Sequence, residues 1–227
     1  MATSELSCAA WVLHRRPYRN SSLLVDVLTE SLGRLCLVAR GGRRDPLLQP
    51  FRPLHIHIKG NGDLKTLVRS EAAAPALPLA GEALYCGLYI NEVLMRLLHR
   101  DDPQDSLLPL YVDTLTNLTP AEAAKDVLLR NFEFRLLDIL GYGFSLEHDR
   151  HGAPINPSMQ YRLLSEQGLE VHPKGEFNGA LLLSLAQSDW QPDVRRLARD
   201  LMRRALAPYL GAKPLASREL FRGVRRE

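Results

Sequence analysis

Apolar and polar residues alternate along the first 80 positions of the chain. Short apolar runs are separated there by turn-forming residues such as Gly41–Gly42 and Asn61–Gly62–Asp63. The predicted strands are Ala9–His14, Ser21–Thr29, Arg34–Ala39, Pro53–Gly60 and Leu64–Ala73. Because the connections are too short for crossover helices, the pattern predicts a small antiparallel β-barrel of the OB or SH3 kind.

The pattern changes after a segment at 72–81 that is rich in Ala and Pro. Apolar residues then recur every three or four positions, which predicts helices. For one of them we expect Thr119 as the N-cap, Pro120 at the first helical position and Glu122 as the capping-box partner. The predicted helices span 81–98, 106–118, 119 to Gly141 or Gly143, 177–187 and 193–206, and a small hairpin is expected around 167–168 within an irregular segment at 144–176.

These elements predict an α+β, multidomain chain. A β-barrel domain is expected at 1–79, followed by a mostly α-helical domain at 80–227. Of the 227 residues, 45% are hydrophobic, which is ample for a packed core. No apolar stretch approaches the roughly 20 residues that a membrane helix needs, so we expect no membrane contact.

The N-terminal residues and the cysteines indicate a cellular compartment. The first residues show no basic region followed by an apolar segment, so a secretory signal is not expected. The three cysteines, Cys8, Cys36 and Cys86, are far apart and form no CxxC pair. They favour a cytoplasmic protein without a zinc site or a disulfide framework.

Charge is distributed unevenly along the chain. Residues 1–80 contain 11 Lys and Arg against 6 Asp and Glu, residues 81–190 contain 8 against 16, and residues 191–227 contain 10 against 4. Basic ends around an acidic middle favour a polyanionic partner. Acidic and basic segments that balance one another for solubility would give the same distribution.

The sequence contains no catalytic constellation. The string "ARGGRR" lacks the Lys-Ser/Thr pair of a nucleotide-binding loop, and no nucleophile motif is present. His55 and His57 share one strand face without a third metal ligand nearby in sequence, and "EHDRHG" at 147–152 lies where polar residues are expected anyway. We expect a protein that is not an enzyme and has no cofactor or metal; the disfavoured alternative is a metal-dependent nuclease that uses His148, Asp149 and His151.

The basic residues fit nucleic acid better than a catalytic site. Three arginines follow the third predicted strand, and further cations stand on the next two strands. OB-type barrels bind single strands by combining cations with stacking aromatic residues. The helix at 193–206 has an apolar face flanked by arginines, which suits a polyanion or an acidic peptide. A solvated loop and an ordinary packing helix are the alternatives for these two segments.

Several strings resemble the RecO family of bacterial recombination mediators: "LHRRPYRNSSLLVDVLTESLGRLCLVARGGRR", "EALYCGLYINEVLMRLL", "FEFRLLDILGYG" and "LAPYLGAKPLASRELF". Their order and spacing agree from about residue 9 to residue 222. The resemblance implies an OB-fold and a helical domain, binding to single- and double-stranded DNA, and annealing of complementary strands. It also implies partnership with RecR and with the C-terminal tail of the single-strand binding protein SSB, indirect action on RecA, and a nucleoid-associated place in the cytoplasm.

The resemblance and the charges together assign residues. Arg130 corresponds to a basic residue of the family's groove for the SSB tail, with Arg203 and Arg204 as further candidates for its rim. The expected DNA-binding residues are Arg40, Arg43, Arg44, Lys59, Lys65, Arg69, Arg203, Arg204, Lys213 and Arg218. An RNA-binding OB-fold protein and an adaptor that binds only proteins are the alternative functions.

The chain departs from the family pattern in two places. Residues 144–176 contain no cysteine, where many members carry a four-cysteine zinc site, so we expect a zinc-free, enterobacterial-like branch. The loop "GGRRDPL" is also shorter than usual, and Asp45 opposes its arginines. DNA contacts are therefore expected to be spread over both domains.

Overall fold

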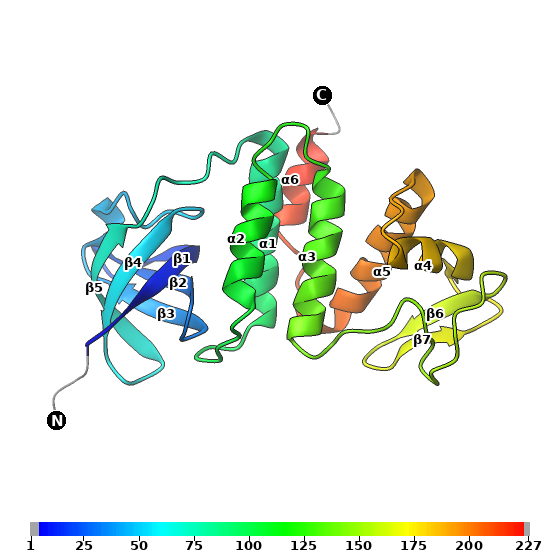
Figure 1. Cartoon of the computed structure of the whole chain (residues 1–227). Coiled ribbons are helices and arrows are strands. Elements are labelled where there is room, and N and C mark those ends of the chain that lie inside the picture. The colour runs from blue at the N-terminus through cyan, green and yellow to red at the C-terminus, as the bar shows by residue number, and fades with distance from the viewer. Residues whose placement is uncertain (1–4, 225–227) are drawn as a thin grey trace. The chain divides into compact units, whose positions relative to one another are not determined.

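The computed structural model describes residues 5–224, which form two compact units (Figure 1). The first unit contains the described residues up to Ala123 together with those from Lys213 onward, and the second unit is 124–212. The predicted domain boundary between residues 79 and 80 stays a prediction. The two units show which elements pack together, which is a different question from where a domain begins.

The first unit contains a closed barrel with the strand order β1-β2-β3-β5-β4. β3 and β5 pair in parallel, and the other neighbouring strands pair antiparallel. This closed five-stranded barrel confirms the predicted OB-fold and the α+β class. The strands are β1 (Glu5–Tyr18), β2 (Ser22–Thr29), β3 (Arg34–Ala39), β4 (Pro53–Lys59) and β5 (Leu64–Ala72).

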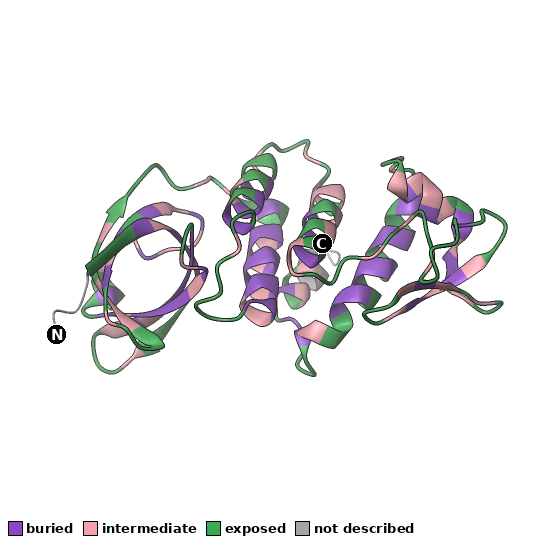
Figure 2. Cartoon of the chain, turned by 60° about the horizontal axis from the view of Figure 1, so that its bottom comes forward, coloured by how far each residue is buried: buried purple, intermediate pink, exposed green. Residues whose placement is uncertain are grey.

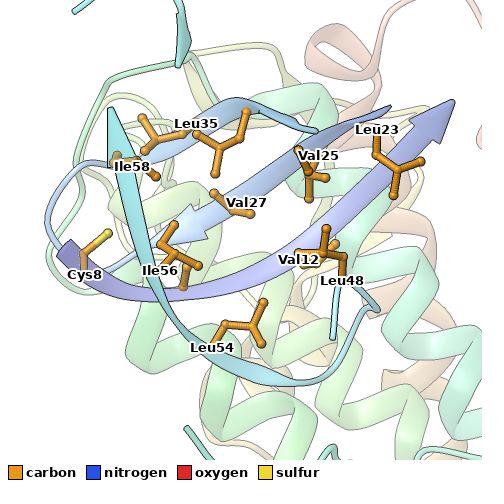
Figure 3. Packing of buried hydrophobic residues seen from close by; sticks show 13 residues of the cluster. Cys8, Val12, Leu23, Val25, Val27, Leu35, Leu48, Leu54, Ile56 and Ile58 are labelled. Atoms are coloured by element: carbon orange, nitrogen blue, oxygen red, sulfur yellow. The ribbon is translucent and has the colours of Figure 1, made fainter. Parts of the chain in front are cut away.

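Alternate residues of these strands fill the interior of the barrel (Figure 3). The register of β1 against β2 shifts between Val12 and His14, and the bulge bends this long strand so that it pairs with both β2 and β4. Leu48, from the connection before β4, joins the cluster and is 1% exposed. Each such fully buried aliphatic side chain stabilises the fold by about 1.5–3 kcal/mol.

Helices α1 (Gly81–Leu97), α2 (Leu107–Asn117) and α6 (Ser217–Val224) belong to the same unit as the barrel. Arg34 connects β3 to the end of α1: its guanidinium donates to the carbonyl oxygens of Met95 and Leu98 at 2.9 and 3.0 Å. The same guanidinium pairs at 2.9 Å with the buried carboxylate of Asp26 on β2. Because this ion pair is also bonded to the end of the helix, the barrel and α1 are held in one arrangement.

The second unit combines helices with a three-stranded sheet of order β7-β6-β8. The predicted hairpin around 167–168 is confirmed, since β6 and β7 pair antiparallel on either side of it. Asn178 begins α4 as its N-cap by accepting hydrogen bonds from the backbone N–H groups of Ala180 and Leu181. The elements are α3 (Lys125–Ile139), β6 (Gln160–Leu164), β7 (Gly168–Val171), β8 (Phe177–Asn178), α4 (Gly179–Ala186) and α5 (Pro192–Leu210).

The predicted start of the third helix is wrong. The hydroxyl of Thr119 donates to the carbonyl of Thr116 at 2.7 Å, so it satisfies the end of α2 and does not cap α3. Residues 120–123 form a turn closed by Ala123 and Pro120, and α3 begins only at Lys125. The capping-box pattern was present in the sequence, but the Thr119 hydroxyl is hydrogen-bonded to the end of the preceding helix, α2.

Helix α5 has the predicted amphipathic character. Figure 2 shows buried residues along it in purple. Val194, Leu197, Leu201 and Ala205 are buried, as the spacing of apolar residues predicted. Its arginines are exposed, and several lie beside acidic residues of the same unit: Arg195 by Asp126, Arg196 by Asp193, and Arg199 and Arg203 by Asp200.

Candidate nucleic-acid interface

The two glycines that follow β3 permit a tight turn. Gly41 has a φ of 69°, a left-handed conformation that strongly favours glycine. Gly42 is buried, and a Cβ added there would lie 2.7 Å from the Cβ of Ala39. A short 3-10 helix, η1 (Gly42–Arg44), follows this turn. The glycines thus fold the backbone closely against the barrel, while Arg43 and Arg44 stay exposed.

Arg43 joins η1 to the turn between β1 and β2. Its guanidinium donates to the carbonyl oxygen of Arg19 at 2.8 Å, and its backbone N–H donates to Ser21. The guanidinium of Arg19 lies 5.1 Å from the centre of the Tyr18 ring, within the range of a cation–π contact. The structure therefore adds Arg19 to the predicted cations, and the string "HRRPYR" was the sequence signal for it.

Arg40 and Arg69 line one hollow of about 240 Å³, together with the backbone of the two glycines. Asp45 also lines it, but both of its carboxylate oxygens are engaged: Oδ1 accepts from the N–H of Leu47 at 2.9 Å and Oδ2 from the hydroxyl of Ser70 at 3.0 Å. Asp45 therefore fastens the turn to β5 in addition to lowering the local positive charge. We call Arg19, Arg40, Arg43, Arg44 and Arg69 the arginine rim.

Arg69 is an exposed member of the arginine rim. Its side chain is 70% exposed, and its Nε lies 2.7 Å from a carboxylate oxygen of Glu71. Exposed ion pairs of this kind contribute little free energy. The guanidinium is thus available to exchange the carboxylate for a phosphate at small cost.

The other predicted DNA-binding residues of the first unit lie elsewhere. Lys65 is 13% exposed in its side chain and pairs with Asp101. Lys59 is exposed at the end of β4, opposite Thr66 of β5. Lys213 is exposed and its carbonyl accepts a hydrogen bond from Arg96, and Arg218 is half-buried on α6. None of these four described residues lines the hollow that Arg40 and Arg69 line.

In the second unit, the side chain of Arg130 is largely buried, whereas Arg204 is exposed. The side chain of Arg130 is only 13% exposed, and its guanidinium lies 2.7 Å from a carboxylate oxygen of Glu133, which is fully buried. Arg204 is exposed and lines a pocket of about 320 Å³. Arg203 is exposed beside it, with Asp200 at 4.0 Å. The role of Arg130 toward the SSB tail stays a prediction, and its ion pair gives it a structural role as well.

The histidine-rich segments are held by local hydrogen bonds. Oδ1 of Asp149 accepts from the backbone N–H groups of His151 and Ala153, both at 2.9 Å, which makes a compact turn. Arg150 and Arg162 both pair with Glu170; the hydrogen bond from Arg162 is the main cause that lowers the pKa of this carboxyl. Within residues 5–224, no three His, Cys, Asp or Glu side chains are grouped to hold a metal ion.

The cysteines and helices bear on two further predictions. Cys8, Cys36 and Cys86 are buried thiols, and burial raises the pKa of Cys8 and Cys36. None of the helices in the described part of the chain is long and apolar enough to cross a membrane. The assignment to a zinc-free branch stays a prediction.

Comparisons with known proteins cover both parts of the chain. Residues 1–76 match the family model for the recombination protein O N terminal, and residues 79–219 match the model for the recombination protein O C terminal. The DNA repair protein RecO of Pseudomonas paraeruginosa is 49% identical over 220 residues, which cover 94% of this chain and 93% of that protein.

Two other relatives extend the comparison. The DNA repair protein RecO of Stutzerimonas stutzeri is 47% identical over 222 residues, or 95% of this chain and 93% of that protein. The DNA repair protein RecO of Actinobacillus succinogenes is 43% identical over 221 residues, with 93% of each chain covered. The similarity therefore spans nearly the full length of these proteins.

Proposed function

Since this chain belongs to the RecO family of bacterial recombination proteins, we propose that it is a recombination mediator in DNA repair. It binds single- and double-stranded DNA and anneals complementary strands. With RecR, it helps load RecA onto single strands that are covered by SSB. It acts by binding, without a catalytic step, and it works in the cytoplasm at the nucleoid.

The arginine rim is the observation that supports DNA binding best. It gathers guanidinium groups from the β1–β2 turn, the end of β3, η1 and β5 around one exposed end of the barrel. A guanidinium donates two parallel hydrogen bonds to phosphate oxygens, and each neutralised phosphate releases counterions. A surface built this way binds the backbone of a strand without regard to its sequence.

Annealing follows from charge neutralisation. Two complementary strands repel each other through their phosphates, and cations that bind both backbones lower this repulsion. In the second unit, the exposed arginines of α5, Arg203 and Arg204 among them, offer a further basic surface in addition to the arginine rim of the first unit. Mediator activity also needs attachment to the SSB-covered strand, for which the SSB tail on Arg130 is the proposed contact.

The test is a salt titration of DNA binding. We expect Arg40→Ala/Arg43→Ala/Arg44→Ala to weaken binding of labelled oligo(dT), measured by fluorescence anisotropy. The slope of log affinity against log salt should become shallower by about 0.7 for each lost phosphate contact on a single strand. Lys174→Ala is the matched control, because Lys174 is an exposed cation outside the predicted DNA-binding residues, and it should leave the slope unchanged.

Four outcomes would count against the proposal. An unchanged slope in the triple variant would remove the rim from the DNA interface. Stronger binding of RNA than of DNA in competition would favour the RNA-binding alternative. Failure of the unaltered chain to anneal complementary strands coated with SSB would contradict the mediator function, and binding to SSB without any DNA binding would indicate a protein-only adaptor.

A further inference from the structure

One pocket of the second unit has an aromatic wall. Its volume is about 320 Å³, and it is lined by residues after α3, from β6 and its following turn, and from the last turns of α5. Tyr142 and Tyr209 stack at this pocket, with 4.2 Å between ring centres and 21° between ring planes. Phe144 and Leu163 add apolar surface.

The tyrosine stack is fixed by the backbone. Gly141 ends α3 with a φ of 78°, and the N–H of Tyr142 then donates back to the carbonyl of Leu137 at 2.8 Å. Gly143 lies so close to Asp138 that a Cβ there would be 2.0 Å from its carboxylate oxygen. Pro208 precedes Tyr209 in the last turn of α5. The rings are therefore held in position before any ligand arrives.

One ring of the stack is exposed and the other is held at its hydroxyl. Tyr142 is 37% exposed, so part of its ring is open to solvent. Tyr209 is half-buried, and Ser165 hydrogen-bonds its hydroxyl. Burial raises the pKa of Tyr209 most, and the nearby charge of Glu166 raises it further. The stack thus presents an aromatic face beside polar groups.

The charged groups at the pocket are of opposite sign. Arg204, on α5, is exposed, and Glu166, in the turn between β6 and β7, is exposed as well. A nucleotide matches this arrangement: its base stacks on an aromatic ring, an N–H group of the base, such as N3–H of thymine, donates to a carboxylate, and its phosphate binds a guanidinium. An acidic peptide matches it less well, because Glu166 would repel its carboxylates.

We propose that this pocket binds one unpaired base of single-stranded DNA against the Tyr142–Tyr209 stack, with the adjoining phosphate on Arg204. The volume lies near the lower end of the range for small-molecule pockets, which suits a single base. This proposal rests on the proposed function, since it assumes that the chain binds single strands. The pocket adds one base contact to the phosphate contacts of the arginines. The bound base is thereby held unstacked and open to pairing.

The first experiment compares bases with phosphates alone. Full-length Tyr142→Ala and Tyr142→Phe are titrated with labelled oligo(dT) and with an abasic oligomer of the same length. Because one base–aromatic stack contributes about 1–3 kcal/mol, Tyr142→Ala should bind oligo(dT) about 5-fold to 100-fold more weakly. It should bind the abasic oligomer as the unaltered chain does, and Tyr142→Phe should keep full affinity for both.

A second experiment locates the base without a disruptive variant. Oligo(dT) carrying one 5-iodouracil is irradiated in complex with the unaltered chain, and the cross-linked peptide is identified by mass spectrometry. Cross-links to Tyr142 or Tyr209 support the proposal. Cross-links confined to the barrel overturn it, and so does equal oligo(dT) affinity of Tyr142→Ala and the unaltered chain.

Three outcomes separate the failure of this proposal from the failure of the proposed function. If the unaltered chain binds no oligo(dT), the proposed function itself fails. If it binds oligo(dT) through the arginine rim alone, only the base pocket fails. If Tyr142→Ala keeps its oligo(dT) affinity but loses binding to an acidic peptide with a C-terminal aromatic residue, the pocket belongs to a protein partner and the proposal is overturned.

Discussion

The carboxylate of Glu92 on α1 caps the start of α6 through Ser217. One carboxylate oxygen accepts from the backbone N–H and the hydroxyl of Ser217 at 2.8 and 2.7 Å, and the other accepts from the N–H of Ala216 at 3.0 Å. Arg96, one turn along α1, donates to the same carboxylate and to the carbonyl of Lys213. Residues distant in sequence are thereby joined by one charged group.

Low pH should release this connection. Burial raises the pKa of Glu92, but the hydrogen bonds from Ser217, Ala216 and Arg96 outweigh it and leave the pKa below its ordinary value of 4.5. A carboxyl with a depressed folded-state pKa stabilises the fold above its ordinary pKa, and this contribution is lost as the pH falls through the folded-state value. We therefore expect the α6 amides to lose protection from hydrogen exchange as the pH falls below the ordinary pKa of 4.5 and through the lower folded-state value.

Glu92→Gln should reproduce the acid effect at neutral pH. The amide keeps the shape of the side chain but loses the charge and one acceptor, so the variant should be less stable by about 1–3 kcal/mol. Glu82→Gln, an exposed position on the first turn of α1, is the matched control and should change nothing. Full protection of the α6 amides in Glu92→Gln would show that the connection is dispensable.

A buried hydrogen-bonded pair joins α1 and α2 of the first unit to the barrel. The hydroxyl of Tyr111 donates to Oδ1 of Asn91 at 2.8 Å, and Nδ2 of Asn91 donates to the carbonyl of Leu13 at 3.0 Å. Trp11 packs edge-on against the Tyr111 ring, with 5.7 Å between ring centres. Tyr111 is 0% exposed, and this burial raises its pKa far above the ordinary value.

Tyr111→Phe should lower the thermal midpoint of unfolding. The substitution keeps the ring but leaves a buried amide oxygen without its donor, which costs about 1–3 kcal/mol and about 2–10 °C in Tm. Calorimetry measures the change. Tyr18→Phe is the control, since its ring is half-exposed and keeps the contact with Arg19. An equal Tm for both variants would mean that the Tyr111 hydroxyl adds no stability.

The sequence predicted the barrel better than the binding surface. The places of all five strands followed from alternating apolar residues, because period-two burial leaves a local signal. The bounds of the first strand were wrong: the predicted Ala9–His14 is only the middle of β1, Glu5–Tyr18, whose ends are mostly exposed and so lack the buried alternation. The arginine rim depends on the hydrogen bond from Arg43 to Arg19, and the aromatic pocket on contact between Tyr142 and Tyr209; no local pattern encodes either contact. The predicted start of α3 was wrong because the Thr119 hydroxyl could serve either the helix before it or the helix after it. It donates to the carbonyl of Thr116 at the end of α2.

Arg130→Ala should destabilise the second unit, because it deprives the buried carboxylate of Glu133 of its ion pair. Breaking such a buried pair costs about 3–5 kcal/mol, measured by urea unfolding. Arg135→Ala, exposed on the same helix, is the control and should have little effect. Arg130→Ala/Glu133→Gln removes both charges and should recover much of the stability. If this double variant folds and still binds an SSB-tail peptide normally, Arg130 is structural; if it folds and binds the peptide weakly, Arg130 contacts the tail.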